Sequence, residues 1–436
     1  MFDLVVRNAR LAGRNALVDL AVEGDRFVRI ATAVDGDARR ELDAERRLVM
    51  PPLVDCHLHL DATLTAGTPR WNESGTLLEG IRIWGELKPS LIIEDVKARA
   101  TEVVRWSVAQ GTLAIRAHAD VSGENEAPLR GLLAVRDELA DLCTIQVTAF
   151  PQDGIYTRAG DDERLENALR LGADCVGGIP HYEATAESGL REVHRVFELA
   201  SEYGRLIDVH CDETDDPSSR YLEVMADDTA KHGLGGRVTA SHCTAMGSYP
   251  PYYSSKLHGF LARCGINVVV NPFANALIQG RLDPYPKRRG FAQVKELLAA
   301  GVNVSLGNDV IMDPWYSLGR ADLVEAASLA LHFTYMSGVD EIAEMLDLAT
   351  VRGARTLGIE DEYGLEEGKP ADLVIFDAPT AQEVLRLHPV RRWVVRRGRV
   401  VAETTPAVTR LFAADGSAEV VTFAPPARSP DAGEQH

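Results

Sequence analysis

Six of the twelve histidines of this chain stand in short polar stretches that directly follow runs of apolar residues. Two of them, His57 and His59, are two positions apart, so on a strand both side chains would point to the same side. Together with His210 and Asp309 they offer three imidazole nitrogens and one carboxylate. That donor set suits Zn²⁺ or Fe²⁺ and poorly suits Mg²⁺ or Ca²⁺. We therefore predict a divalent metal site, although a single His-x-His pair is often an ordinary polar pair in a loop.

Four further residues could act beside such a metal, and each has a plainer interpretation. Glu213 follows His210 by three positions, which would let its carboxylate shuttle a proton to a substrate, or it could be a surface or helix-capping acid. For His242, spacing alone favours a core histidine bonded to a carbonyl. Gln152 could equally cap a loop, and Trp315 could be a packing residue.

The elements that would position these residues are eight apolar, β-branched runs, each followed by a segment with apolar residues three and four apart. The runs lie at 51–55, 113–116, 145–150, 175–179, 206–209, 238–241, 266–270 and 302–306. Eight strand–helix alternations predict a (β/α)₈ TIM-type barrel rather than an open sheet. In such a barrel the chemistry lies where strands end and the following loops begin, which is where the polar stretches fall.

The two ends of the chain differ from the middle in their pattern of apolar and polar residues. Short apolar runs broken by Gly and Asn are typical of hairpin strands, and they occur near both termini. We predict that residues 1–50 and 365–424 form one small β-sandwich domain and that residues 51–364 form the barrel. Residues 425–436, rich in Pro, Ala, Asp and Gly, are predicted to be a flexible tail.

Composition excludes several classes of function. The 46 Lys and Arg against 65 Asp and Glu give a net charge of −19, which argues against a nucleic-acid partner. No apolar run approaches the length of a membrane span, and the first residues carry an acid where a secretory signal carries bases. The six cysteines show no paired spacing, and Cys211 and Cys243 are expected to pack rather than bind metal. We predict a cytoplasmic protein with free thiols.

The order of these residues resembles the amidohydrolase superfamily, with His-x-His after the first run, His after the fifth and sixth, and Asp after the eighth. Longer stretches are similar to bacterial cytosine deaminases, and the similarity runs from about residue 2 to residue 410. These stretches are 68–77, 149–154, 179–183, 206–213, 285–290 and 313–316.

The resemblance implies a role for each candidate. One metal ion, zinc or iron, would be bound by His57, His59, His210 and Asp309. Glu213 would shuttle the proton, and His242 would orient or polarise the water on the metal. Gln152 would hydrogen-bond the edge of a pyrimidine, while Trp315 and Leu77 would wall the pocket; Leu77 could equally be an ordinary core leucine. The loop after the fourth run contains no lysine to bridge two metals, so one ion is expected, and the resemblance also implies a homo-oligomer.

One departure from the family bears on the substrate. Cytosine deaminases read Gly-His-Asp-Asp after the eighth strand, whereas this chain reads Gly307-Asn308-Asp309-Val310. Val310 removes an acceptor that faces the pyrimidine, and a substrate donor left unpaired there would lose about 1–3 kcal/mol. A ring with a methyl or other apolar substituent, or a related heterocycle, is therefore a candidate substrate.

The sequence thus predicts a metal-dependent hydrolytic deaminase of a free amino-substituted heterocycle. Cytosine or a cytosine-like ring, possibly 5-substituted, would release ammonia on attack by a metal-bound hydroxide. A related aminohydrolase is the alternative, acting on an s-triazine N-alkylamine, isoguanine or a cyclic amidine such as creatinine. A non-catalytic scaffold is a further alternative, which the complete set of four ligands disfavours.

Overall fold

The central element of the fold is a sheet of eight parallel strands, described in a computed structural model that covers residues 1–424. The predicted flexible tail, 425–436, lies outside the described residues. In chain order the strands are β6 (Leu53–Leu58), β7 (Thr112–Asp120), β8 (Thr144–Phe150), β9 (Cys175–Gly178), β10 (Leu206–Cys211), β11 (Val238–His242), β12 (Asn267–Val270) and β13 (Asn303–Leu306). Each strand pairs with the next one in the chain, as in a barrel.

The barrel closes where its last strand meets its first. A parallel bridge joins Leu58 and Asp309, the N–H of Asp309 donates to the carbonyl of His57 at 2.7 Å, and the N–H of His59 donates to the carbonyl of Asp309 at 2.8 Å. These bonds tie the chain after β13 to the end of β6. The predicted (β/α)₈ barrel is confirmed, and all eight predicted strands are present.

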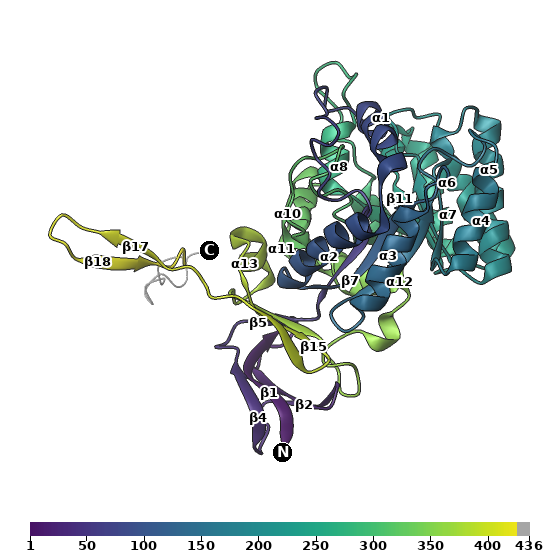
Figure 1. The fold of residues 1–436 in the computed structure, drawn as a ribbon. Coiled ribbons are helices and arrows are strands. Elements are labelled where there is room, and N and C mark those ends of the chain that lie inside the picture. Colours follow the sequence, from purple (N-terminus) through teal and green to yellow (C-terminus); the bar gives the residue numbers. More distant parts are fainter. Residues whose placement is uncertain (425–436) are drawn as a thin grey trace.

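Helices surround the barrel strands (Figure 1). They are α1 (Leu77–Leu87), α2 (Ile93–Ala109), α3 (Ala127–Glu138), α4 (Asp161–Leu171), α5 (Ala186–Tyr203), α6 (Tyr221–His232), α7 (Pro251–Cys264), α8 (Pro272–Ile278), α9 (Val294–Ala299), α10 (Leu323–Phe333), α11 (Val339–Leu348) and α12 (Val351–Leu357). A further helix, α13 (Ala381–Leu387), packs against α10 and α11. In α5, Val193, Val196 and Phe197 recur at helical spacing and are buried, so one apolar stripe faces the strands. Thr185 caps this helix by accepting from the N–H of Ser188.

The two ends of the chain meet in a second sheet. Its strands are β1 (Phe2–Leu11), β2 (Val18–Glu23), β3 (Arg26–Ala31), β4 (Ala38–Asp43), β5 (Leu48–Met50), β14 (Leu373–Phe376), β15 (Arg391–Arg396) and β16 (Arg399–Glu403). The order is β16-β15-β14-β5-β1-β2-β3, with β4 pairing with β1, so the junction between the two ends is β5 against β14. One core is shared by Leu20 from the first end and Ile375 from the second.

A two-stranded hairpin, β17 (Thr409–Phe412) and β18 (Ala418–Val421), follows this sheet and extends away from it (Figure 1). Its strands pair only with each other in the part of the chain that the structure describes. Within the same residues, no helix is long and apolar enough to cross a membrane.

Candidate active site

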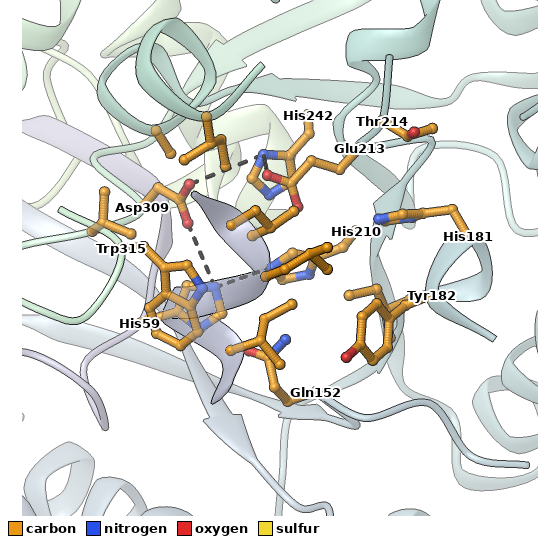
Figure 2. A pocket seen from close by; sticks show the side chains of 17 residues that line it. His59, Gln152, His181, Tyr182, His210, Glu213, Thr214, His242, Asp309 and Trp315 are labelled. Carbon is orange, nitrogen blue, oxygen red and sulfur yellow. Dashed lines mark hydrogen bonds and ion pairs between the residues drawn. The ribbon is translucent and has the colours of Figure 1, made fainter. Parts of the chain in front are cut away.

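The carboxyl ends of the barrel strands bring together the four predicted metal ligands. His59 Nε2 and His210 Nε2 are 3.0 Å apart, and Asp309 Oδ1 lies 3.3 Å from His57 Nε2 and 3.5 Å from His59 Nε2. The four donor atoms all lie within 4.8 Å of one another, and all four residues are buried. Figure 2 shows His59, His210 and Asp309 converging from different strands.

This spacing fits a single metal ion. Nitrogen and oxygen ligands at about 2.0–2.2 Å from one ion, in a roughly tetrahedral arrangement, lie about 3.3–3.6 Å apart, close to the separations of 3.0, 3.3 and 3.5 Å found here. His57 Nε2 is buried and has no hydrogen-bond partner among the described residues, as expected for a ligand atom. Burial lowers the pKa of His57 and His210 well below the usual value and that of His59 to about 4. The imidazoles are therefore neutral, which is the form that binds metals.

Local backbone structure fixes Asp309 against the His-x-His pair. Asp309 has a φ of +67°, an uncommon conformation for a non-glycine residue, and this turns its side chain towards the ligand cluster just after β13. Asn308 stabilises the turn: its backbone N–H and its Nδ2 donate to the two oxygens of Asp55, at 3.0 and 2.7 Å. Asp55 also accepts from the N–H of His57, so one carboxylate connects the end of the first barrel strand, β6, to the turn after the last, β13.

Glu213 and His242 lie together beside the cluster (Figure 2). Glu213 Oε1 is 3.3 Å from His242 Nδ1, and both side chains are buried. Burial and the nearby Asp309 carboxylate raise the pKa of Glu213 well above its usual value, so it can hold a proton at neutral pH. The amide nitrogens of Asn271 and Asn275 lie 3.3 and 3.0 Å from His242 Nδ1 and fix its ring. Burial lowers the pKa of His242, which keeps it neutral.

These groups face a cavity of about 200 Å³. Drug-sized ligands occupy pockets of about 300–1,000 Å³, so this volume suits one small ring. The polar side is formed by three of the predicted metal ligands together with two further residues: His59, His210, Asp309, Glu213 and His242. The remaining walls are mainly apolar and include Leu77, Ile81, Ile179, Ile278, Val310 and Trp315.

All four residues expected to contact substrate line this cavity. The amide of Gln152 makes no hydrogen bond to any of residues 1–424, so it is free to bond a ligand. Trp315 lies with its ring centroid 6.1 Å from that of His59, next to the cluster. Val310 is 3% exposed, and Leu77 forms part of the wall at the first turn of α1. Their roles towards a substrate stay predictions.

Three polar residues of the cavity received no role from the sequence: His181, Tyr182 and Thr214. His181 lies in the loop after the fourth strand, β9, and that position was the available signal. Burial lowers the pKa of His181 to about 4, so it is a neutral imidazole able to donate one hydrogen bond and accept another. It therefore adds a second adaptable polar group to the cavity, besides Gln152.

Helix α1 covers one side of the cavity and is held at its carboxyl end. Lys88 donates to Asp120 at 2.9 Å and to Asp153 at 2.8 Å, which connects α1 to the ends of β7 and β8. At the middle of the helix, Gly80 allows a close approach: a Cβ atom there would lie 2.4 Å from Cδ1 of Trp315. The absence of a side chain at Gly80 thus sets how deeply Trp315 reaches into the cavity.

Comparisons with known proteins show the family to which the chain belongs. A model of the amidohydrolase family matches residues 40–402. The solved structure of 5-methylcytosine deaminase from Klebsiella pneumoniae with 5-fluorocytosine is 43% identical, with a TM-score of 0.91, covering 93% of this chain and 99% of that one. N-isopropylammelide isopropyl amidohydrolase of Pseudomonas sp. strain ADP is 29% identical over 92% of this chain and 98% of its own. Pterin deaminase of Rhizobium rhizogenes is 28% identical over 85% of each chain.

Proposed function

The chain belongs to the amidohydrolase family of metal-dependent enzymes that act on C–N bonds, and from this premise we propose that it deaminates a free cytosine-type ring with a methyl group at C5. The metal would be one ion of zinc or iron, held by His57, His59, His210 and Asp309. Water is the second substrate, and ammonia is released.

The observation that carries this proposal is the apolar side chain of Val310 in the cavity wall. It directly follows Asp309, at the position where cytosine deaminases have a second carboxylate. An isopropyl group there offers a surface for a ring methyl group and no acceptor for a ring N–H. The similarity to the 5-methylcytosine deaminase of K. pneumoniae supports the same substrate class.

The side chains of the cavity divide the proposed reaction between them. A bound divalent ion would lower the pKa of a water molecule from about 15.7 to about 7 and so supply hydroxide at neutral pH. Asp309 would accept the proton released from the attacking water, and His242 would orient that water towards the ring. Glu213, which holds a proton, donates it to the ring nitrogen and makes the adjacent carbon electrophilic. A C–O bond would form and the exocyclic C–N bond would break, with the amine taking the proton held by Asp309 and leaving as ammonia. The proton of the new hydroxyl group would pass to Glu213 as that group becomes a carbonyl, which restores the protonated Glu213.

Recognition of the ring would come from the remaining walls. Gln152 carries both a donor and an acceptor, which match the alternating donors and acceptors of a pyrimidine edge. Trp315 and Leu77 enclose the flat faces of the ring. The small cavity volume favours a free base over a nucleoside or a nucleic acid.

A second candidate function is removal of an alkylamine from an s-triazine. It is favoured by the similarity to N-isopropylammelide isopropyl amidohydrolase and by the mainly apolar cavity wall. The two functions differ in their leaving group, which is ammonia for the deaminase and isopropylamine for the triazine enzyme.

A substrate panel separates them. The purified enzyme, loaded with zinc or with iron, is assayed for ammonia and alkylamine release from cytosine, 5-methylcytosine, N-isopropylammelide, pterin, isoguanine and creatinine. We expect the highest kcat/KM with 5-methylcytosine. A higher value with N-isopropylammelide or pterin would overturn the proposal, and the isosteric variant Glu213→Gln controls for a contaminating activity.

A further inference from the structure

Below the predicted metal ligands, the barrel interior holds a series of hydrogen-bonded, buried polar side chains that the proposed reaction does not use. It consists of Arg116 on β7, Asp208 on β10 and Ser241 on β11, all 0% exposed. Arg116 Nη1 donates to Asp208 Oδ2 at 2.9 Å, and Ser241 Oγ donates to Asp208 Oδ1 at 2.7 Å. Ser241 Oγ also lies 2.9 Å from Nδ1 of His57, so this series of hydrogen bonds ends at a predicted metal ligand.

A count of protons fixes the direction of the last hydrogen bond. A guanidinium always carries its protons, so Asp208 faces a permanent cation and acts as a carboxylate, which only accepts. The single hydroxyl hydrogen of Ser241 is used towards Asp208, so its oxygen must accept from His57. Nδ1 of His57 therefore carries the hydrogen, and a neutral imidazole has only one. Nε2 is left with its lone pair free.

That free lone pair belongs to the atom that lies in the ligand cluster. His57 Nε2 is 3.3 Å from Asp309 Oδ1 and has no hydrogen-bond partner among residues 1–424. A histidine that binds a metal is neutral and carries one ring hydrogen, so the alternative tautomer would place that hydrogen on Nε2 and block this ligand.

Arg116, the first side chain of this series, is also held by several hydrogen bonds. The guanidinium of Arg116 also donates to Oε1 of Gln146 at 3.0 and 3.1 Å, to Oγ1 of Thr239 at 3.0 Å and to the carbonyl of Thr356 at 2.9 Å. These bonds fix the side-chain conformation of Arg116. Because Asp208 accepts from Arg116, its carboxylate is fixed as well.

The same bonds argue against a second metal ion at a neighbouring cluster in the barrel interior. His57, His118 and Asp208 also lie close enough to one another to share a cation. However, the two oxygens of Asp208 accept from Arg116 and Ser241, and the guanidinium at 2.9 Å repels a second positive charge. This group therefore does not form a second metal site.

We propose that Ser241 and Asp208 are positioning residues that hold His57 in the Nδ1–H tautomer and so prepare Nε2 to bind the metal. Partners of this kind orient ligating histidines, and their loss costs about 10–100-fold in metal affinity. The inference does not depend on which heterocycle is the substrate, so it can fail while the proposed function stands, and the reverse.

The test compares Ser241→Ala with Ser305→Ala. Ser305 is an equally buried serine of the barrel interior, but it bonds to Thr356 and to no metal ligand. Zinc affinity is measured by competition with a chromogenic chelator. We expect Ser241→Ala to weaken zinc binding by about 10–100-fold and Ser305→Ala to leave it unchanged. Equal affinities in the two variants would overturn the proposal.

A spectroscopic test reports the tautomer directly. Long-range ¹H–¹⁵N correlation of metal-free, ¹⁵N-histidine-labelled protein distinguishes Nδ1–H from Nε2–H, and the His57 signals are assigned by their loss in His57→Gln. We expect Nδ1–H in the wild type and a mixture of tautomers in Ser241→Ala. A wild-type signal of the Nε2–H form would contradict the proposal.

Asp208→Asn provides a second, sharper variant. Its amide oxygen would accept from Arg116, so its NH₂ group would face Ser241 and donate to it. Ser241 would then donate to Nδ1 of His57, which inverts the tautomer and weakens zinc binding more than Ser241→Ala does. If this variant does not fold, Ser241→Ala and its control still decide the matter.

Discussion

Replacing Val310 by aspartate should move the substrate preference from 5-methylcytosine to cytosine. Val310 is 3% exposed and forms part of the cavity wall directly after Asp309. The substitution replaces an apolar surface by an acceptor within the same wall. Cytosine can then approach the new carboxylate, whereas a methyl group on the ring would cover it.

Two contributions give the size of the shift. Loss of the apolar contact of one methyl group costs about 0.8 kcal/mol. A carboxylate covered by a methyl group and left without a partner costs about a further 1–3 kcal/mol. The sum is about 2–4 kcal/mol, which corresponds to a change of roughly 30- to 700-fold in the ratio of the two kcat/KM values.

The assay measures kcat/KM for cytosine and 5-methylcytosine in the wild type, Val310→Asp and Val310→Thr, with the metal content of each preparation. Threonine keeps the shape of valine and carries no charge, so Val310→Thr should shift the ratio by much less. An unchanged ratio in fully metal-loaded Val310→Asp would refute the reasoning, because it would mean that this side chain does not face the C5 edge of the ring.

Three further substitutions test other parts of the site. Glu213→Gln should keep its metal and lose about 10²–10⁴-fold in kcat; substantial residual turnover would remove Glu213 from its role as proton donor. Gly80→Ala should push Trp315 about 1 Å into the cavity and lower kcat/KM by about 10–100-fold without changing metal content, and an unaltered kcat/KM would show that the helix yields instead. Lys88→Met removes the only cation among residues 1–424 that is paired with the buried carboxylate of Asp120, whereas the half-buried Asp153 keeps Arg158, and it should lower the free energy of unfolding in urea by about 3–5 kcal/mol. The matched variant Lys97→Met breaks a more exposed ion pair and should cost less than about 1 kcal/mol; similar losses in the two variants would contradict this difference.

The barrel could be predicted because its strands are buried on both faces. Such strands appear in the sequence as continuous apolar runs, and all eight runs coincide with strands of the structure. The polar stretches after the runs then gave the candidate site, since the carboxyl ends of the strands meet at one end of a barrel. The structure does bring His57, His59, His210 and Asp309 together.

The interior ion pair could not be predicted. Arg116 and Asp208 each interrupt an apolar run. The sequence does not show which other charged residue either of them pairs with, because that depends on the closed barrel. They lie on β7 and β10, which are not neighbours in the sheet, so their pairing depends on the tilt and register of all the strands between them.

The position of α1 over the cavity could not be predicted from the sequence either. The contact between Gly80 and Trp315 joins positions 235 residues apart, and only the placement of α1 over the strand ends reveals it. The role of Asn275 as a partner of His242 likewise depends on where α8 begins. The homo-oligomer and the cytoplasmic location stay predictions.

The most direct test of the central claim is the dependence of turnover on one equivalent of metal per chain. The purified enzyme is stripped with a chelator, analysed for zinc and iron, and then titrated with either ion while ammonia release from 5-methylcytosine is followed. The proposed site predicts no turnover in the stripped protein and full recovery at one ion per chain. Full activity of the metal-free protein, or recovery that needs two ions, would contradict a single-metal site built from His57, His59, His210 and Asp309.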